Sequence, residues 1–287
     1  MPKSKREVDV VVLSDIHLGT MGCRAEELLK YLNSVQPKKV ILNGDIVDIW
    51  QFSKRYWPKS HMRIIKHFTS LLSKGVPIYY ITGNHDELLR RFEGFQLGGL
   101  SIVNKLILNL NGKKAWFFHG DVFDVTMQYA KWLTKLGSIG YDLLIMINSL
   151  VNFFAKMIGR EKVSLSKKLK NSVKSAVKFI NSFEQTAADI AISKGYDYVV
   201  CGHIHHPEMK ELSNKEGSTH YLNSGDWIES LSALEYHKGS WRIYQYSEDQ
   251  KAKELEPDLA SYQLDDYDKI FKELLGEFME ENHATAS

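Results

Sequence analysis

The chain has 287 residues, of which 44% are hydrophobic and 25% are charged, the composition of an ordinary soluble globular protein with ample material for a core. Its only two cysteines, Cys23 and Cys201, exclude a disulfide framework. The length favours one large α/β domain with an insertion over two domains of equal size.

The formal net charge of +2 hides an uneven distribution. The segment from Glu248 to Glu281 holds 12 acidic and 4 basic residues, a charge of −8, so the rest of the chain carries about +10. A basic body of this kind favours an anionic substrate or an anionic surface as its partner.

Residues 1–120 alternate between predicted strands and helices. Helical patterns near Arg24–Val35 and Met62–Lys74 separate the first three strands, and this βαβ rhythm predicts parallel pairing. Asn111-Gly112 predicts a hairpin turn between two further strands. Strand patterns return from Tyr198 to about Tyr246. Five apolar runs read as buried strands: Val10–Leu13, Val40–Leu42, Ile78–Ile81, Trp116–Phe118 and Tyr198–Cys201.

Residues 121–192 carry helical patterns and no strand pattern, so we expect a helical insertion there. Ile139–Gly159 is apolar apart from one polar stripe, which predicts an amphipathic helix and not a membrane span. Arg160–Lys178 is strongly basic with an apolar face. Such helices lie on anionic membranes or line anionic pockets. The alternative is a solvated basic face on an ordinary helical cap.

Both ends of the chain carry simpler expectations. Asp265–Asn282 is predicted to be an acidic, structural helix with an apolar inner face. The first six residues lead directly into a strand without the apolar stretch of a signal peptide, so we expect a cytoplasmic protein.

Five short polar motifs each follow one of the buried strands. Open α/β sheets place their chemistry at the carboxyl ends of their strands, so these loops should meet at one edge. All the candidate side chains are hard or borderline metal ligands. The motifs are Asp15-Ile16-His17, Gly44-Asp45, Gly83-Asn84-His85-Asp86, His119-Gly120-Asp121 and Gly202-His203-Ile204-His205.

The motifs supply enough ligands for two divalent ions that share a water molecule and clamp a phosphoryl group. Asp15 and His17 stand two residues apart, so they share a face and bind one ion, which His205 completes. Asp45 bridges the two ions. Asn84 offers a neutral amide oxygen as a further ligand, and the imidazoles of His119 and His203 bind the second ion. Mixed nitrogen and oxygen ligands without thiolate favour Mn²⁺, with Fe or Zn²⁺ as alternatives.

The motif series resembles the signature of the calcineurin-like metallophosphoesterases and spans Asp15 to His205. The resemblance implies an α/β fold of four αββα layers, with a core formed by residues 1–120 and 193–287 and a helical cap formed by residues 121–192. It also implies a metal-dependent hydrolase with the dinuclear site described above. His85 would lie near the substrate phosphate, which Asn84 also contacts, as proton donor or electrostatic stabiliser. Asp86 would orient its imidazole.

Several details are similar to the UDP-2,3-diacylglucosamine pyrophosphatase branch of lipid A synthesis. That branch has motifs G-D-x-x-E-x-W, G-H-T-H-R-P and L-G-D-W and a helical insertion after H-G-D. The chain departs from it in having Gly83-Asn84-His85-Asp86 where many members have G-N-R-D, and in lacking their paired aspartates after H-G-D. The similar segments here are Gly44–Trp50, Gly202–Pro207 and Asn223–Trp227.

The resemblance implies hydrolysis of the pyrophosphate bond of UDP-2,3-diacylglucosamine to UMP and 2,3-diacylglucosamine 1-phosphate. The expected partners are this nucleotide-linked lipid and, peripherally, the inner membrane surface, with no nucleic acid and no obligate protein partner. The alternative is a soluble phosphodiesterase or phosphatase acting on a nucleotide or another phosphoester. A metal-free binding scaffold would have lost ligands, and none is missing. One set of residues could serve a nucleic-acid groove, but we expect it to stack on a single ligand or to pack against the cap: Trp50, Phe52, Lys54, Arg55, Tyr56 and Trp57.

Overall fold

The computed structural model describes residues 5–50, 56–123 and 165–254, with the side chains of its long helix α4 described from residue 177 onward. The helices and strands run in the order β1 (Arg6–Val8), β2 (Val10–Leu13), α1 (Ala25–Ser34), β3 (Val35–Pro37), β4 (Val40–Asn43), α2 (Lys59–Ser73), β5 (Ile78–Ile81), η1 (Glu87–Phe92), β6 (Gln96–Leu97), β7 (Leu100–Val103), β8 (Leu106–Leu110), β9 (Lys113–Phe117), η2 (Asp121–Phe123), α4 (Leu165–Ser193), β10 (Tyr198–Cys201), β11 (Glu208–Asn214), β12 (Gly217–Asn223), β13 (Ser232–His237), β14 (Ser240–Gln245), η3 (Tyr246–Glu248) and α5 (Gln250–Lys253).

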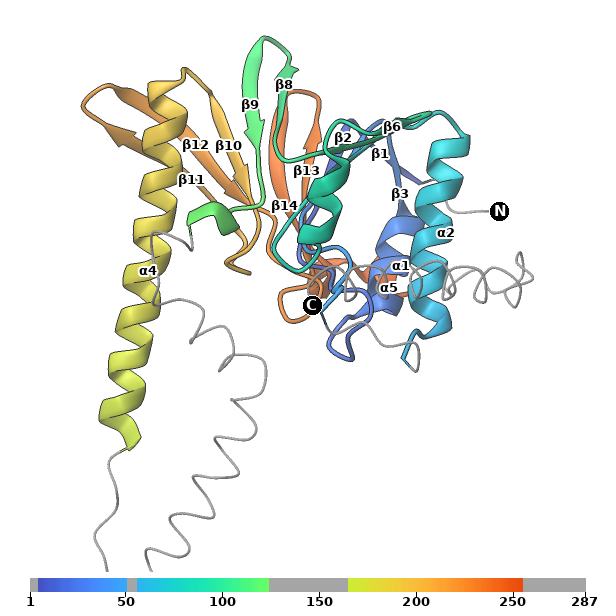
Figure 1. Ribbon diagram of the computed structural model, residues 1–287, viewed down its shortest axis with the longest axis horizontal. Coiled ribbons are helices and arrows are strands. Elements are labelled where there is room, and N and C mark those ends of the chain that lie inside the picture. Colours follow the sequence, from blue (N-terminus) through green and yellow to red (C-terminus); the bar gives the residue numbers. More distant parts are fainter. Residues whose placement is uncertain (1–4, 51–55, 124–164, 255–287) are drawn as a thin grey trace, which may run out of the picture.

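Two large sheets form the centre of the protein (Figure 1). The seven-stranded sheet has the order β14-β13-β2-β4-β5-β7-β6, and β2, β4, β5 and β7 run parallel. The five-stranded sheet has the order β11-β12-β10-β9-β8, with β9, β10 and β12 parallel. The carboxyl ends of these parallel strands carry the polar motifs, as the βαβ pattern predicts.

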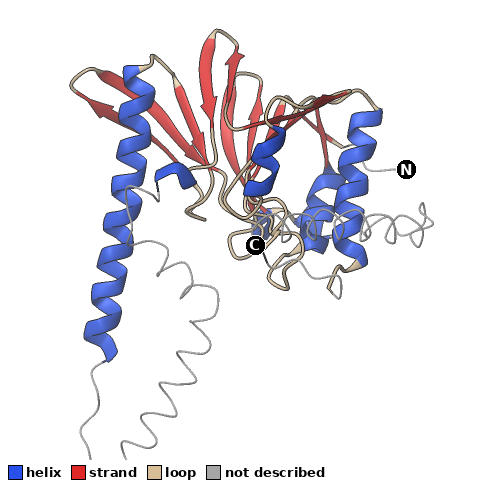
Figure 2. Ribbon diagram, viewed as in Figure 1, coloured by secondary structure: helices blue, strands red, loops and turns tan. Residues whose placement is uncertain are grey.

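Successive side chains of the central strands point to opposite faces of the sheet, and this alternation shows how the four layers pack. In β2, Val10 and Val12 pack between the two sheets, whereas Val11 and Leu13 pack toward α1 and α2. The same period of two appears in β10, where Val200 faces the other sheet and Val199 faces α4. Both faces of each central strand are therefore buried, which explains their continuous apolar sequences. Helices cover the outer faces (Figure 2), and the predicted αββα architecture is confirmed.

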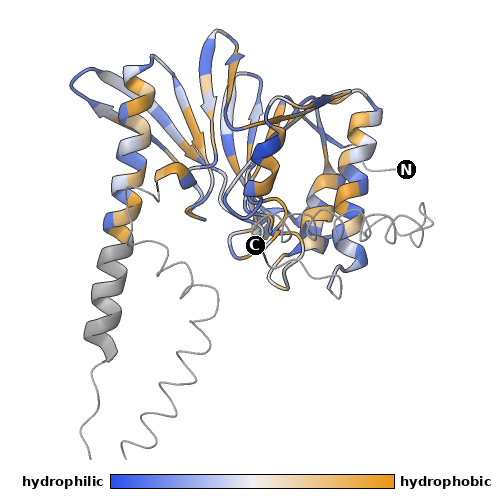
Figure 3. Ribbon diagram, in the orientation of Figure 1, coloured by the Kyte–Doolittle hydropathy of each residue, from blue (hydrophilic) through white to orange (hydrophobic). Residues whose placement is uncertain are grey.

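The helices predicted near Arg24–Val35 and Met62–Lys74 are confirmed as α1 and α2, and the predicted hairpin is confirmed too. In α1 the buried residues include Leu28, Leu29 and Leu32, spaced to give one apolar face, and Figure 3 shows hydrophobic and hydrophilic residues mixed along α1 and α2. The hairpin joins Leu110 to Lys113 across the predicted Asn-Gly turn. Asn111 and Gly112 have φ values of 53° and 86°, the left-handed pair that a type I′ turn requires.

The structure describes only the two ends of the expected insertion, η2 and α4. The carboxyl-terminal part of α4 packs on the five-stranded sheet through Phe183, Ala187 and Ala191, so it forms the outer layer there. The expected helices at Ile139–Gly159 and Asp265–Asn282 lie outside the described residues. Among the described helices, none combines the length and apolarity needed to cross a membrane.

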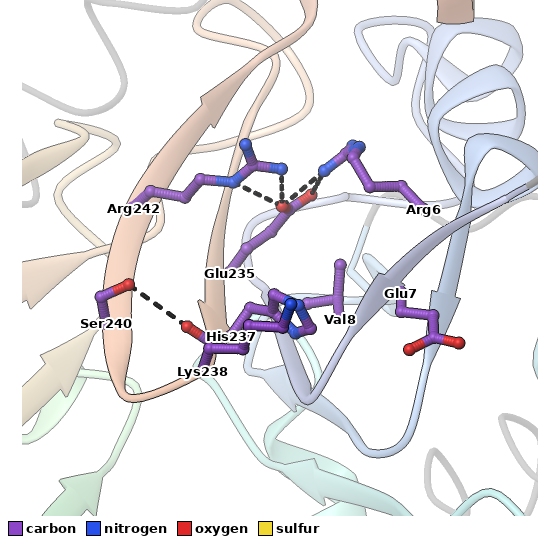
Figure 4. Close-up of a pocket in the computed structure, with 8 residues that line it drawn as sticks. All are labelled: Arg6, Glu7, Val8, Glu235, His237, Lys238, Ser240 and Arg242. Atoms are coloured by element: carbon purple, nitrogen blue, oxygen red, sulfur yellow. Dashed lines mark hydrogen bonds and ion pairs between the residues drawn. The ribbon is translucent and has the colours of Figure 1, made fainter.

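A groove of about 400 Å³ separates β1 from β13 and β14 (Figure 4). The buried carboxylate of Glu235 in this groove is paired within the protein. It accepts hydrogen bonds from Arg6 at 2.7 Å, Arg242 at 2.8 Å and the Tyr31 hydroxyl at 3.0 Å. The groove contains none of the five motifs, and the shared carboxylate ties the small β1–β3 sheet to β13.

Candidate metal centre

The loops that follow the strands hold most of their candidate ligand residues in a left-handed backbone conformation. Five of the candidate ligand residues have φ between 51° and 68°, the left-handed region that costs non-glycine residues on the order of 1 kcal/mol or more each. They are Asp15, His17, Asp45, His203 and His205. These side chains thus turn inward from tight loops, and the strand alternation from which we expected Asp15 and His17 to share a face is not what aims them.

Glycines in the motifs make room for ligands of other motifs. A Cβ atom on Gly44 would lie 2.3 Å from the His119 ring, and one on Gly83 would lie 2.2 Å from Oδ1 of Asp45. A Cβ on Gly202 would lie 2.7 Å from Oδ2 of Asp15. Each of these glycines is therefore required by close approach, and Gly44 also adopts a φ of 86° that favours glycine.

The first cluster of ligand atoms comes from Asp15, His17 and His205, whose donor atoms all lie within 4.8 Å of one another. Nε2 of His205 is 3.2 Å from Oδ1 of Asp15. Asp15 is fully buried, and its other oxygen accepts the backbone N–H of His203 at 3.0 Å. The three residues that we expected to hold one ion therefore converge.

The second cluster joins Asp45, His119 and His203 within the same distance limit. Nε2 of His119 lies 3.2 Å from Oδ2 of Asp45, and this same oxygen is 4.0 Å from Nε2 of His17 in the first cluster. Asp45 thus stands between the clusters, where a bridging carboxylate belongs. Its Oδ1 atom accepts the backbone N–H of His85 at 2.8 Å.

In His119 and His17, the Nδ1 atom lies close to an oxygen of the surrounding protein. Nδ1 of His119 lies 2.8 Å from the carbonyl oxygen of Asn43, and Nδ1 of His17 lies 3.3 Å from Oδ2 of Asp48. This Asp48 oxygen is also 2.9 Å from Nδ1 of His85. Such partners fix the ring orientation of a metal-bound histidine. No residue type indicates a role for the backbone carbonyl of Asn43, whereas Asp48 is recognisable as the acidic residue of the Gly44–Trp50 motif.

The expected role of Asp86 is wrong. Its buried carboxylate accepts hydrogen bonds from the backbone N–H groups of Ile46 at 2.9 Å and Gly83 at 2.5 Å, and from the Tyr80 hydroxyl at 2.6 Å. With these three donors Asp86 braces two ligand loops, while Asp48 contacts His85. Burial, followed by the charge of Asp45, raises the pKa of Asp86 to about 6.

The other two predicted residues lie on the loop after β5. The backbone carbonyl oxygen of Asn84 accepts a hydrogen bond from Nε1 of Trp50 at 3.0 Å, and the backbone N–H of His85 donates to Asp45. The His85 side chain is 28% exposed, whereas Asp15, Asp45 and His119 are buried. A bound substrate can therefore reach His85.

The charges of the site favour cations. Burial raises the pKa of Asp15, but the imidazoles of His205 and His119 outweigh it and lower that pKa to about 2. Burial opposes ionisation of Asp45 too, yet His119 and His17 hold its pKa well below the usual range. Both carboxylates are anionic at neutral pH. Burial lowers the pKa of His205, but Asp15 and Asp226 raise it to about 9, so a cation there competes with a proton.

Four buried oxygen and nitrogen atoms of the candidate ligands have no hydrogen-bond partner in the described residues. They are Oδ1 of Asp15, Nε2 of His17, Oδ1 of Asn84 and Nε2 of His119. Buried polar atoms normally have partners, and leaving one unsatisfied costs about 1–3 kcal/mol. All four belong to expected ligands. Carboxylate, amide and imidazole donors without thiolate fit two divalent cations, which would satisfy these atoms.

Comparison with known proteins agrees with this geometry. The model of the family called calcineurin-like phosphoesterase matches residues 8–207, more than half of the chain. The UDP-2,3-diacylglucosamine hydrolase of Aeromonas salmonicida is 25% identical over 246 residues, covering 83% of this chain and 93% of that protein. The enzyme of the same name from Stenotrophomonas maltophilia strain K279a is 22% identical and covers 80% of this chain and 96% of its own.

Solved structures that match the chain include a novel archaeal phosphodiesterase, with a TM-score of 0.40, 14% identity, and coverage of 82% of this chain and 98% of that one. The zinc complex of Vps29 from Entamoeba histolytica has a TM-score of 0.35, 13% identity, and coverage of 82% and 97%. The family match over residues 8–207, the two ligand clusters and the hydrolases among the relatives lead to one conclusion: the chain belongs to the calcineurin-like phosphoesterase family and is a metal-dependent hydrolase.

Proposed function

We propose that the chain binds two divalent ions, Mn²⁺ in preference to Fe or Zn²⁺, and hydrolyses the pyrophosphate bond of UDP-2,3-diacylglucosamine. Asp15, His17 and His205 would hold one ion, and Asn84 with the histidines of the second cluster would hold the other, with Asp45 shared. The observation that carries the proposal is the pair of three-residue clusters around one carboxylate, with unsatisfied donor atoms on both sides of it. Bound in this way, the ions would activate a water molecule and neutralise charge on the phosphoryl group.

His85 is the residue that we propose to act on the substrate. Its imidazole is partly exposed, and the buried carboxylate of Asp48 at 2.9 Å from Nδ1 directs Nε2 away from the interior. Burial lowers the pKa of His85, but Asp48 and Asp45 outweigh it and raise that pKa above its usual value. A positive N–H donor at this position stabilises charge on the phosphate and can give a proton to the leaving oxygen.

The proposed substrate is supported by the names of the relatives and by the composition of the insertion, and not by the geometry of the metal centre. The curated relatives that share most of their length with this chain are named UDP-2,3-diacylglucosamine hydrolases. The expected insertion, residues 121–192, is helical where the structure describes it and contains the basic segment Arg160–Lys178. A basic helix beside the apolar segment Ile139–Gly159 suits a diphosphate that carries acyl chains. We propose that this insertion is the cap that selects the lipid.

The direct experiment measures turnover of two matched substrates by the protein loaded with Mn²⁺. We expect kcat/KM for UDP-2,3-diacylglucosamine to exceed that for deacylated UDP-glucosamine, with UMP and 2,3-diacylglucosamine 1-phosphate identified by mass spectrometry. Bis-p-nitrophenyl phosphate serves as a control for the metal centre alone. Equal kcat/KM values for the two nucleotide sugars would reject the lipid and favour a soluble phosphodiesterase or phosphatase acting on a nucleotide or another phosphoester.

The proposed substrate also locates the protein. A diacylated nucleotide sugar resides at a membrane, so we propose a cytoplasmic protein in peripheral contact with the inner membrane surface. The basic segment would supply the contact, because each Lys or Arg near an anionic bilayer contributes about 1 kcal/mol. Co-sedimentation with vesicles containing phosphatidylglycerol should fall as salt is raised. Equal recovery with neutral vesicles would reject an electrostatic contact.

A further inference from the structure

The loop after β12 takes no part in the ligand clusters, yet it touches their residues. Trp227 donates its backbone N–H to the carbonyl oxygen of Asp15 at 3.1 Å. One residue before Asp15, the Ser14 hydroxyl lies 2.6 Å from the Ser224 hydroxyl. This loop, Asn223–Trp227, is one of the segments that resemble a motif, and nothing in the proposed chemistry uses it. Its contacts point to a role in supporting the first cluster.

Asp226 lies at the centre of this loop and is buried. Its Oδ1 atom accepts three backbone N–H groups, from Ile228 at 2.7 Å, Glu229 at 2.6 Å and Ser230 at 3.2 Å. These bonds fix the orientation of the carboxylate. The other oxygen, Oδ2, accepts the Ser230 hydroxyl at 3.1 Å and lies 3.7 Å from Nδ1 of His205. One oxygen is thus committed to the loop, and the second faces a candidate metal ligand.

The two nitrogens of His205 face opposite partners. Nδ1 faces Asp226, while Nε2 lies 3.2 Å from Oδ1 of Asp15, inside the first cluster. When Nε2 gives its lone pair to a metal ion, the remaining proton of the ring lies on Nδ1, and the Asp226 carboxylate is placed to face that N–H. The lone pair of Nε2 then points into the cluster.

We propose that Asp226 is a positioning residue that keeps a proton on Nδ1 of His205 and so leaves Nε2 able to bind a metal ion. This inference rests on the proposed two-metal centre and deepens it. In the second cluster the comparable partner of His119 is the neutral carbonyl oxygen of Asn43. Carboxylate support raises the basicity of an imidazole ligand, so Asp226 strengthens the first cluster selectively.

The variant Asp226→Asn separates the contact with His205 from the hydrogen bonds that hold the loop. Oδ1 of the asparagine can still accept the three backbone N–H groups, which leaves its amide NH₂ facing Nδ1 of His205. An N–H donor there favours the opposite tautomer, with the proton on Nε2, and that proton blocks a metal ion. We expect a 10–100-fold weaker affinity for one of two Mn²⁺ ions and little change for the other.

The measurement is Mn²⁺ binding at equilibrium, by electron paramagnetic resonance of free Mn²⁺, on the full chain. Asp249→Asn is the matched control, since Asp249 also accepts a backbone N–H, from Ala252 at 3.0 Å, and lies outside both clusters. In a His205→Ala background, Asp226→Asn should have no further effect, because the residue acts through that imidazole. Thermal unfolding of the metal-free variants checks that they fold.

Nitrogen-15 NMR of the histidine rings in the wild-type protein loaded with Zn²⁺ needs no variant. Nδ1 of His205 should carry the proton, and a metal-bound Nδ1 would overturn the assignment. If the wild-type protein binds two ions and Asp226→Asn binds both with unchanged affinity, the role of Asp226 is wrong while the proposed centre stands. If the wild-type protein binds no ions, the proposed function itself fails.

Discussion

Nδ1 of His85 lies 2.9 Å from Oδ2 of Asp48, a carboxylate that is buried beneath the candidate site. This pairing orients the ring, and the carboxylates of Asp48 and Asp45 outweigh burial to raise the pKa of the imidazole. The same Asp48 oxygen lies 3.3 Å from Nδ1 of His17, so His17, Asp48 and His85 form a third close group beside the two ligand clusters. Since Asp48 faces Nδ1 of His85 and the ring is partly exposed, we expect His85 to act on the substrate and to contribute little to metal binding.

His85→Ala should lower kcat by about 10²–10³ while both bound ions are retained, because the variant removes transition-state stabilisation and no ligand. The measurement combines steady-state kinetics with metal analysis of the same preparation. Loss of an ion together with loss of rate would make His85 a ligand.

Asp45→Ala should abolish activity and release at least one ion while the fold survives. Oδ2 of Asp45 lies within 4.0 Å of ligand atoms from both clusters, so its removal leaves two cations close together with no anion between them. Elemental analysis after gel filtration gives the number of ions. Two ions retained by this variant would exclude a bridging role.

Gly83→Ala should release an ion and abolish activity, because the added methyl group displaces the Asp45 carboxylate. The added Cβ would lie 2.2 Å from Oδ1 and 2.6 Å from the backbone nitrogen of Asp45, so the carboxylate must move. Gly94→Ala is the matched control, because its Cβ would meet nothing within 4 Å and only its φ of 84° is strained. The control should lose about 1 kcal/mol of stability and keep its ions. Full metal binding by Gly83→Ala would show that the loops can relax around a methyl group.

His61 should make the metal-free protein less stable in acid. Burial lowers its pKa to about 4, and its Nδ1 atom accepts the backbone N–H of Gly19 at 3.0 Å, which requires a neutral ring. Since the pKa is about 6.5 in the unfolded chain, the unfolded state binds the proton first, and stability falls as the pH drops from 6.5 toward 4.

Urea unfolding at pH 7.5 and 4.5 tests this dependence. Between these values the wild-type protein should lose about 2 kcal/mol more than His61→Asn, whose amide oxygen can replace Nδ1 as an acceptor and does not titrate. Equal losses for the two proteins would mean that the ring is already solvated or protonated in the fold.

Removing the interior of the insertion should change substrate choice and leave the metal centre assembled. The deletion must keep Asp121–Phe123 and α4 from Phe183 onward, because the Phe183 ring would be only 2.7 Å from a Cβ on Gly120 and its centroid lies 6.4 Å from that of His203. Hydrolysis of bis-p-nitrophenyl phosphate should survive. Turnover of the diacylated substrate should collapse, since each buried methylene contributes about 0.8 kcal/mol. Equal losses for both substrates would place the insertion in the catalytic centre.

The sequence predicted much of the core because its signals are local. Continuous apolar runs at Val10–Leu13 and Tyr198–Cys201 indicated strands buried on both faces, and Asn111-Gly112 indicated the tight turn. The convergence of the motifs followed from parallel strands. Two features did not follow: the left-handed backbone at Asp15 and His17, and the contact of His85 with Asp48. The first depends on loop geometry that residue types leave open. The second depends on which of two carboxylates already has backbone partners, and Asp86 has three donors.

The glycines of the motifs make the loops mutually dependent. Gly44 makes room for the ring of His119, Gly83 for the carboxylate of Asp45, and Gly202 for that of Asp15, so each loop leaves space for a side chain of a different loop. A loop transplanted alone from another phosphoesterase would therefore have to match the shape of its neighbours as well as supply a ligand. Attempts to retune this centre for another metal or reaction should exchange the interlocked loops together.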